Sequence, residues 1–155
     1  MEPTINRYRP RDSQRSAVYR WERSMSEWPG QSLSLDDCKE LIAKVCTTYH
    51  IHIPTVRDGR GTRVARGGAW IINLPRWART DIVVLHECAH SIICCLHIPG
   101  ASHGKVFATL FLLLLKRFSN VDTVRARKLG ITQRPRRVHF ASITLINALL
   151  EGNKQ

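Results

Sequence analysis

The chain has 155 residues, of which 43% are hydrophobic, with 24 Lys and Arg against 12 Asp and Glu. This length and composition are typical of one globular domain and exclude a disordered or low-complexity chain. The longest apolar run, residues 106–115, is too short to cross a bilayer, and the first seven residues lack the apolar segment of a signal peptide. We therefore expect a cytoplasmic protein without a membrane partner, built as a single domain over residues 1–155, with residues 1–9 and 152–155 as flexible ends.

The formal net charge of +12 is unevenly distributed along the chain. Residues 57–79 contain six Arg and one Asp, for a net charge of +5, and residues 116–137 contain eight Lys or Arg and one Asp, for +7. Residues 80–115 between them sum to −1. Because basic segments attract phosphate backbones, the two flanking segments predict contact with nucleic acid.

The five cysteines indicate reduced thiols. Their number is odd, and no pair has the C-x-x-C spacing of a structural zinc site. They are Cys38, Cys46, Cys88, Cys94 and Cys95.

The first third of the chain predicts two helices. Residues 10–25 begin with a proline, which suits a first turn, and repeat apolar residues at spacings of three and four. Residues 35–49 have a longer apolar stripe, preceded by Ser34 as an N-cap and with two acidic residues in the first turn.

A small antiparallel or mixed sheet is expected next. Residues 51–56 and 62–65 flank the turn sequence Asp58-Gly59-Arg60-Gly61, which predicts a β-hairpin. Residues 69–74 read as a third strand that Pro75 ends, and we expect this strand to be the sheet edge that could bind an extended peptide.

The segment from Thr80 or Asp81 to Leu96 predicts a helix that is apolar nearly all round and so belongs in the core. It contains His86-Glu87-Cys88-Ala89-His90, an H-E-x-x-H pattern. Residues four apart lie on one helix face, so the two imidazoles can converge on one metal ion, with zinc as the first choice. Glu87 lies about 100° further round, which suits a general base acting on a zinc-bound water.

Three further helices are expected in the last third. The first should start at His103 after a Ser102 cap and pack directly against the histidine helix. A basic helix over residues 120–129 should end at Gly130, followed by a basic loop at 133–137 and a helix over 138–150. The complete pattern predicts an α+β fold.

A catalytic zinc ion commonly has three protein ligands, so one more is needed. No Asp or Glu lies between Glu87 and Asp122, which excludes a carboxylate ligand on the next helix. His97 comes one residue too late for the metzincin pattern. His103 is favoured, and His97, His139 and His52 remain as alternatives.

The motif Leu85-His86-Glu87-Cys88-Ala89-His90, followed by His103-Gly104-x-x-Phe107, resembles the SprT-like and minimal zincin metallopeptidases. Residues 11–22 are similar to the start of a family of small metallohydrolases from bacterial and phage genomes. The resemblance implies a zincin-like fold, zinc on His86, His90 and His103, and Glu87 as general base. The cysteine-rich zinc ribbon that SprT proteins usually append is absent, so a DNA-repair role does not follow.

The leading hypothesis is a zinc-dependent hydrolase, specifically a metallopeptidase that acts on a peptide or protein. His139, Arg66 and Arg137 are candidates for binding the oxyanion or substrate. The main alternative is a basic, nucleic-acid-associated protein whose zinc is structural or vestigial. A third hypothesis treats the helix as a scaffold for a phage or host interaction.

Overall fold

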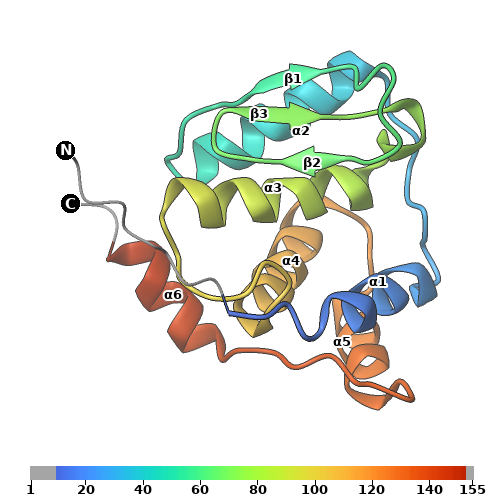
Figure 1. The fold of residues 1–155 in the computed structure, drawn as a ribbon, viewed down its shortest axis with the longest axis vertical. Helices are drawn as coiled ribbons and strands as arrows, with labels where there is room; N and C mark the ends of the chain where they lie inside the picture. Colours follow the sequence, from blue (N-terminus) through green and yellow to red (C-terminus); the bar gives the residue numbers. More distant parts are fainter. Residues whose placement is uncertain (1–9, 153–155) are drawn as a thin grey trace.

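The computed structural model describes residues 10–152 and has an α+β fold (Figure 1). The expected flexible ends, 1–9 and 152–155, lie outside these residues except for Gly152. The described part contains six α-helices and one three-stranded sheet. The helices are α1 (Arg15–Ser24), α2 (Leu35–Thr48), α3 (Asp81–Cys95), α4 (Lys105–Phe118), α5 (Thr123–Thr132) and α6 (Ile143–Glu151).

The sheet is mixed, with strand order β1 (Thr55–Arg57), β3 (Ile71–Asn73), β2 (Arg66–Gly67). β1 runs parallel to β3, and β2 runs antiparallel to it. β2 lies beside α3, and α2 passes behind the strands in the view of Figure 1.

The predicted hairpin between residues 51–56 and 62–65 is wrong, because β1 and β2 occupy opposite edges of the sheet. The third strand is shorter than the predicted 69–74 and is the central strand, not an edge. Residues 58–61 do turn the chain, but this turn is attached to the segment that follows β3.

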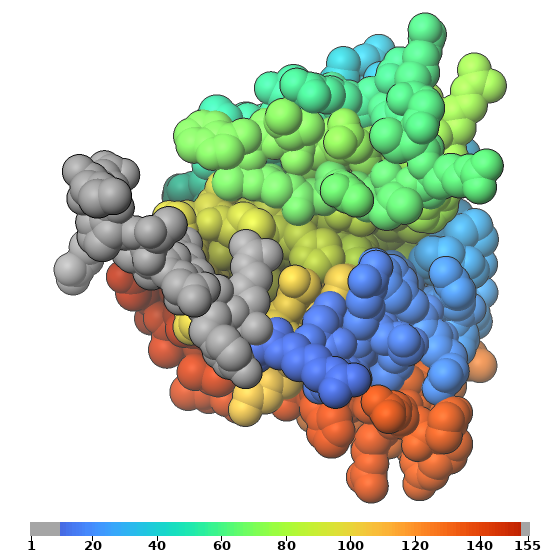
Figure 2. Space-filling model, viewed as in Figure 1, coloured from blue at the N-terminus to red at the C-terminus, as the bar shows by residue number. Residues whose placement is uncertain are grey.

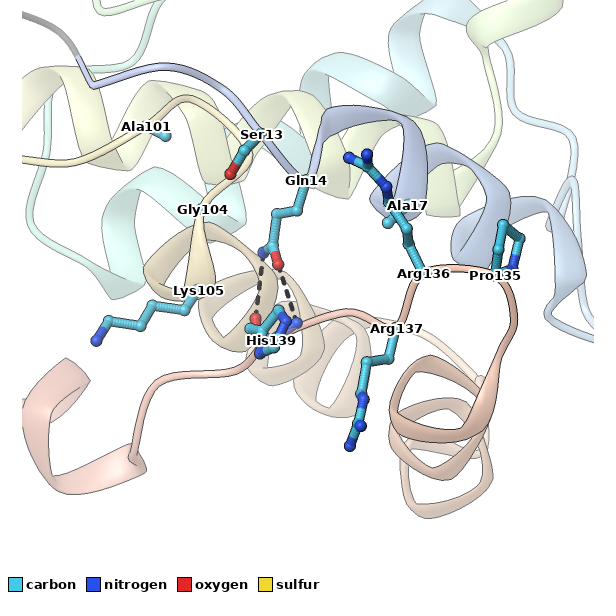
Figure 3. Close-up of a pocket in the computed structure, with 10 residues that line it drawn as sticks. All are labelled: Ser13, Gln14, Ala17, Ala101, Gly104, Lys105, Pro135, Arg136, Arg137 and His139. Carbon is cyan, nitrogen blue, oxygen red and sulfur yellow. Dashed lines mark hydrogen bonds between the residues drawn. The ribbon is translucent and has the colours of Figure 1, made fainter.

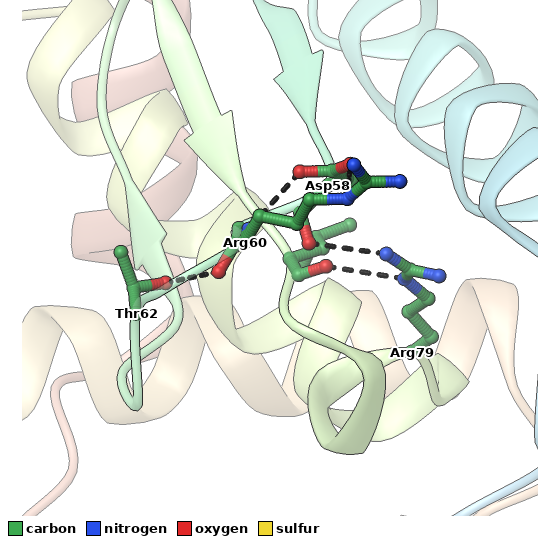
Figure 4. Close-up of polar contacts among 6 residues, drawn as sticks. Asp58, Arg60, Thr62 and Arg79 are labelled. Carbon is green, nitrogen blue, oxygen red and sulfur yellow. Dashed lines mark hydrogen bonds and ion pairs between the residues drawn. The ribbon is translucent and has the colours of Figure 1, made fainter.

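Two contacts make that attachment. Gly59 has a φ of +66°, and a Cβ there would lie 2.5 Å from the nitrogen of Pro75. The Arg79 guanidinium donates hydrogen bonds to the carbonyl oxygens of Asp58 (3.0 Å) and Leu74 (3.1 Å), and Figure 4 shows Arg79 beside the Asp58 turn. The end of β1 is therefore held against the end of β3, which favours the parallel pairing.

The histidine helix α3 forms the centre of the molecule, as its apolar composition predicted. Thr80 caps it, because its hydroxyl accepts from the backbone N–H of Val83 at 3.4 Å. α4 and α2 pack against it. Its buried apolar residues are Ile82, Val83, Val84, Leu85, Cys88, Ala89 and Ile92.

Two helices begin later than predicted. α1 begins at Arg15 rather than Pro10, and Gln14 just before it exchanges hydrogen bonds with the backbone of His139. α4 begins at Lys105, so His103 lies in the preceding turn and not in the first helical turn.

The last two helices also differ from their predicted bounds. α5 continues through Gly130, which was expected to end it. A Cβ at Gly130 would lie 3.0 Å from the Phe140 ring and 3.2 Å from Trp21 Nε1, so this glycine permits close packing. α6 starts only after Ser142, whose hydroxyl accepts from Leu145 N–H. Within residues 10–152, no helix combines the length and apolarity that crossing a membrane requires.

Candidate metal centre

His86 and His90 lie one turn apart on α3, with ring centroids 5.0 Å apart. His86 is buried between aromatic rings, with the Phe107 centroid at 4.8 Å and the Phe111 centroid at 5.5 Å. His90 is partly exposed and stacks on Phe107 at 4.5 Å. Phe107 therefore contacts both imidazoles and Phe111 contacts His86, so both rings lie on the side of α3 that faces α4.

The turn before α4 brings His103 to this pair. Its Nε2 lies 3.2 Å from His90 Nε2, and one ligand nitrogen from each of the three rings lies within 4.8 Å of the others. Around a tetrahedral zinc ion with Zn–N distances of 2.0–2.1 Å, ligand nitrogens would be about 3.4 Å apart. The three histidines thus form a group that could hold a metal ion after small ring movements.

Two carboxylates hold two of these rings from outside. Asp12 accepts a hydrogen bond from His103 Nδ1 at 2.8 Å with one oxygen, and from the His103 backbone N–H at 3.0 Å with the other. Glu22 Oε1 lies 3.1 Å from His86 Nδ1, and both side chains are buried. Since Nδ1 of each ring is occupied, Nε2 is left to face the centre of the group, which is the usual role of a carboxylate behind a metal-binding histidine.

The electrostatic surroundings favour neutral rings at two of the three positions. Burial lowers the pKa of His90 to about 2, and the charges of His86 and His103 lower it too. Burial also lowers the pKa of His103, against the opposing effect of Asp12. For His86, burial lowers the pKa, but the charge and hydrogen bond of Glu22 raise it by more. Neutral imidazole is the form that binds a metal ion.

Glu87 is buried beside the histidines but is not a member of the group. Burial raises its pKa, while His86 and the Gly67 amide lower it. Gly67 of β2 packs directly on α3, because a Cβ at that position would lie 2.2 Å from the Glu87 carbonyl oxygen. The missing side chain thus allows an edge strand to lie against the backbone of α3 at Glu87.

A cavity of about 230 Å³ opens beside His86 and Glu87. Tyr19 lines it, with its ring stacked on His86 at 5.6 Å and tilted against His103 at 5.1 Å. In Figure 2, atoms of α3 are visible between the sheet segment above and α1 below. A small molecule or chain segment in this cavity would therefore reach His86 and Glu87.

Asp12, Tyr19 and Glu22 were not among the predicted site residues, although all three lie within the amino-terminal segment 11–22. The sequence did indicate that Glu22 needs a buried partner. Glu22 follows Val18 by four residues and Trp21 by one, so its carboxylate shares the apolar side of α1.

The other predicted residues lie elsewhere. His97 and His52 are exposed and do not join the histidine group, and His52 packs on Trp70 at 4.8 Å. His139 and Arg137 line a separate cavity of about 560 Å³, where Figure 3 shows Gln14 bonded to the His139 backbone and the Arg137 side chain extending away. Arg66 is exposed on β2 and does not line the cavity beside Glu87.

None of the described cysteines joins the histidine group, and all five are free thiols. Burial raises the pKa of Cys46 to about 11, and that of Cys88 well above its ordinary value. The candidate centre therefore consists of imidazoles and carboxylates alone.

Comparison of the chain with protein-family models, curated proteins and solved structures finds no match. The geometry of the centre is therefore the basis for assigning a function.

Proposed function

We propose that the protein is a zinc-dependent hydrolase of zincin-like fold, and specifically a metallopeptidase. The observation that supports this most directly is the convergence of His86, His90 and His103, with Glu87 following the first of them on α3. Three imidazole ligands suit zinc and leave one of four tetrahedral positions for water or substrate. A structural zinc site commonly has four protein ligands, so this composition favours a catalytic role.

A zinc ion bound here would lower the pKa of a coordinated water and polarise a carbonyl group. The side chains of the protein would transfer the proton and orient the metal ligands. Glu87 accepts the proton from the attacking water and passes it to the leaving amine. Asp12 and Glu22 keep the His103 and His86 rings oriented.

The substrate's carbonyl oxygen needs a hydrogen-bond donor as it becomes negatively charged. Tyr19 is better situated for this than His139, Arg66 or Arg137, because its ring contacts two of the histidines and lines the cavity beside Glu87. An extended peptide would pair with β2, the edge strand next to α3, rather than with β3 as the sequence suggested.

Metal analysis of the purified protein tests this proposal. One zinc ion per chain is expected, and zinc should be lost in the His86→Ala, His90→Ala double variant. Zinc at 100 times its Kd should stabilise the fold by about 2.7 kcal/mol through mass action, which a thermal melt can measure. Correctly folded wild type that binds no zinc would refute the proposal.

Glu87→Gln tests the catalytic part. The variant should bind zinc like wild type but cut no sites in a proteome-derived peptide library, because the amide cannot accept the proton. Glu40→Gln, on the exposed side of α2, is the matched control and should cleave like wild type. Equal cleavage by Glu87→Gln and wild type would refute the role of Glu87.

A second candidate function, nucleic-acid association with zinc as a structural or vestigial element, is favoured by one specific observation. The adjoining elements α1 and α5 and the loop 133–137 expose nine basic side chains, and no described carboxylate lies within salt-bridge distance of them. They are Arg15, Arg20, Arg23, Arg125, Arg127, Lys128, Arg134, Arg136 and Arg137. We call this the α1–α5 basic surface.

A further inference from the structure

The cavity beside His86 and Glu87 has a second part whose chemistry differs from that of the metal centre. Much of its wall away from the histidines is apolar and comes from three segments distant in sequence: Trp28 after α1, Val64 and Ala65 before β2, and Trp77 before α3. This arrangement belongs to the tertiary structure, because no sequence motif unites the three segments.

The apolar wall faces solvent. Val64 is 51% exposed and Trp77 is 54% exposed, which is unusual for neighbouring large apolar residues that line one concavity. The Trp77 indole N–H donates to the Arg63 carbonyl oxygen at 3.1 Å, which fixes the ring beside the Val64 segment. The wall is therefore preformed and open to a ligand.

The volume of the cavity limits what it can take. Pockets for whole drug-sized ligands typically span about 300–1,000 Å³, whereas this cavity has about 230 Å³. One large side chain fits this space better than a complete small molecule. Aromatic rings also pack favourably against the two indoles that line it.

The charged residues that line the cavity add a second requirement for the ligand. Arg23 and Arg63 also line it, both are exposed, and no described carboxylate lies within salt-bridge distance of either guanidinium. The two acidic residues that line it, Glu22 and Glu87, are buried beside His86. The exposed part is therefore positive and favours a ligand with an acidic group next to its apolar one.

We propose that this cavity is a side-chain specificity pocket, which binds a large apolar residue, preferably aromatic, next to the bond that is cut, with a neighbouring acidic residue held by Arg23 and Arg63. The proposal rests on the metallopeptidase function and names its substrate class: peptides in which an aromatic or large aliphatic residue adjoins Asp or Glu.

Peptide binding to the Glu87→Gln protein, loaded with zinc, tests the pocket without cleavage. The probes are fluorescein-labelled hexapeptides with phenylalanine and aspartate side by side in a glycine background, read by fluorescence anisotropy. Replacing the phenylalanine with alanine should weaken binding about tenfold or more, since burying an aromatic side chain contributes that much. Replacing the aspartate with asparagine should weaken it several-fold, and more at low salt than at high salt.

Two pairs of variants assign these preferences to the cavity. Trp77→Ala should abolish the preference for phenylalanine, and Trp70→Ala should keep it, because Trp70 is 70% exposed and lies outside the cavity. Arg23→Gln with Arg63→Gln should abolish the preference for aspartate. Arg20→Gln with Arg76→Gln makes the same change in net charge away from the cavity and should preserve it.

Equal binding of all the peptides, or equal losses in the control variants, would overturn the pocket assignment. A cleavage assay with zinc-loaded wild type separates the pocket assignment from the proposed metallopeptidase function. Cleavage without preference for apolar and acidic residues would overturn the pocket and keep the hydrolase. The expected binding preferences without any cleavage would keep the pocket as a peptide site and overturn the hydrolase.

Discussion

At the scale of single residues, the candidate centre depends on side chains that position other side chains. Asp12 uses both carboxylate oxygens on His103, one on the ring and one on the backbone N–H. Glu22 is buried against the His86 ring. Neither carboxylate belongs to the histidine group itself, so their effect on a metal ion would be exerted through the imidazoles.

Asp12→Asn should reduce zinc affinity about 10- to 100-fold, because the amide keeps an oxygen for the backbone N–H but removes the charge behind the His103 ring. Competition with a chromogenic chelator measures the affinity. Asp36→Asn, at an exposed position in the first turn of α2, is the matched control and should bind zinc like wild type. Unchanged affinity in Asp12→Asn would mean that its contact with His103 does not support metal binding.

At the scale of elements, α1 is the helix that brings Tyr19 and Glu22 to the centre, and α5 holds it there. The Trp21 indole N–H donates to the buried Ala126 carbonyl oxygen at 2.7 Å. The same ring meets Phe111 of α4 and Phe140 edge-on, with centroids 5.8 Å and 5.3 Å away. One buried side chain thus connects α1 to both α4 and α5.

Trp21→Phe should lower the free energy of unfolding by about 1–3 kcal/mol, since it removes the indole hydrogen bond to the Ala126 carbonyl oxygen and leaves part of a fully buried ring unfilled. Urea unfolding monitored by circular dichroism measures the change. Trp70→Phe makes the same substitution on the exposed surface and should change stability by no more than about 0.5 kcal/mol. If the two variants were equally stable, the hydrogen bond would not be a significant link between α1 and α5.

At the scale of the whole molecule, the basic residues group differently in space from the way they group along the sequence. The two basic segments, 57–79 and 116–137, lie at opposite ends of the view in Figure 1, one around the sheet and the other around α5. Within the second segment, α5 packs against α1, which carries the exposed residues Arg15, Arg20 and Arg23. A nucleic acid would therefore meet the α1–α5 basic surface rather than one surface made from both segments.

Electrophoretic mobility shifts across a salt series test that surface. If nucleic acid binds there, its affinity should fall steeply as the salt concentration rises. A triple variant should reduce the slope of log K against log[salt] by about one for each phosphate that is no longer neutralised; its substitutions are Arg125→Gln, Lys128→Gln and Arg136→Gln. The control Arg57→Gln, Arg60→Gln, Arg76→Gln removes three positive charges near the sheet and should leave the slope unchanged. Equal slopes for both triple variants, or no binding at low salt, would contradict this surface.

The sequence by itself determined the features that depend on neighbours along the chain. The apolar pattern and the Thr80 cap predicted α3, and helical spacing put His86 and His90 on one face, since helix geometry is fixed within a turn or two. Elimination among the remaining histidines favoured His103, which does meet them.

Only the tertiary structure decided which distant segments meet. Asp12 and His103 are 91 positions apart, and Glu22 and His86 are 64 apart, so no local pattern could pair them. The same holds for the parallel pairing of β1 with β3 and for the apolar cavity beside Glu87. Local periodicity sets which face of an element is apolar, but the packing of several such faces at once chooses their partners, and at this centre it brought the amino-terminal carboxylates behind the histidines.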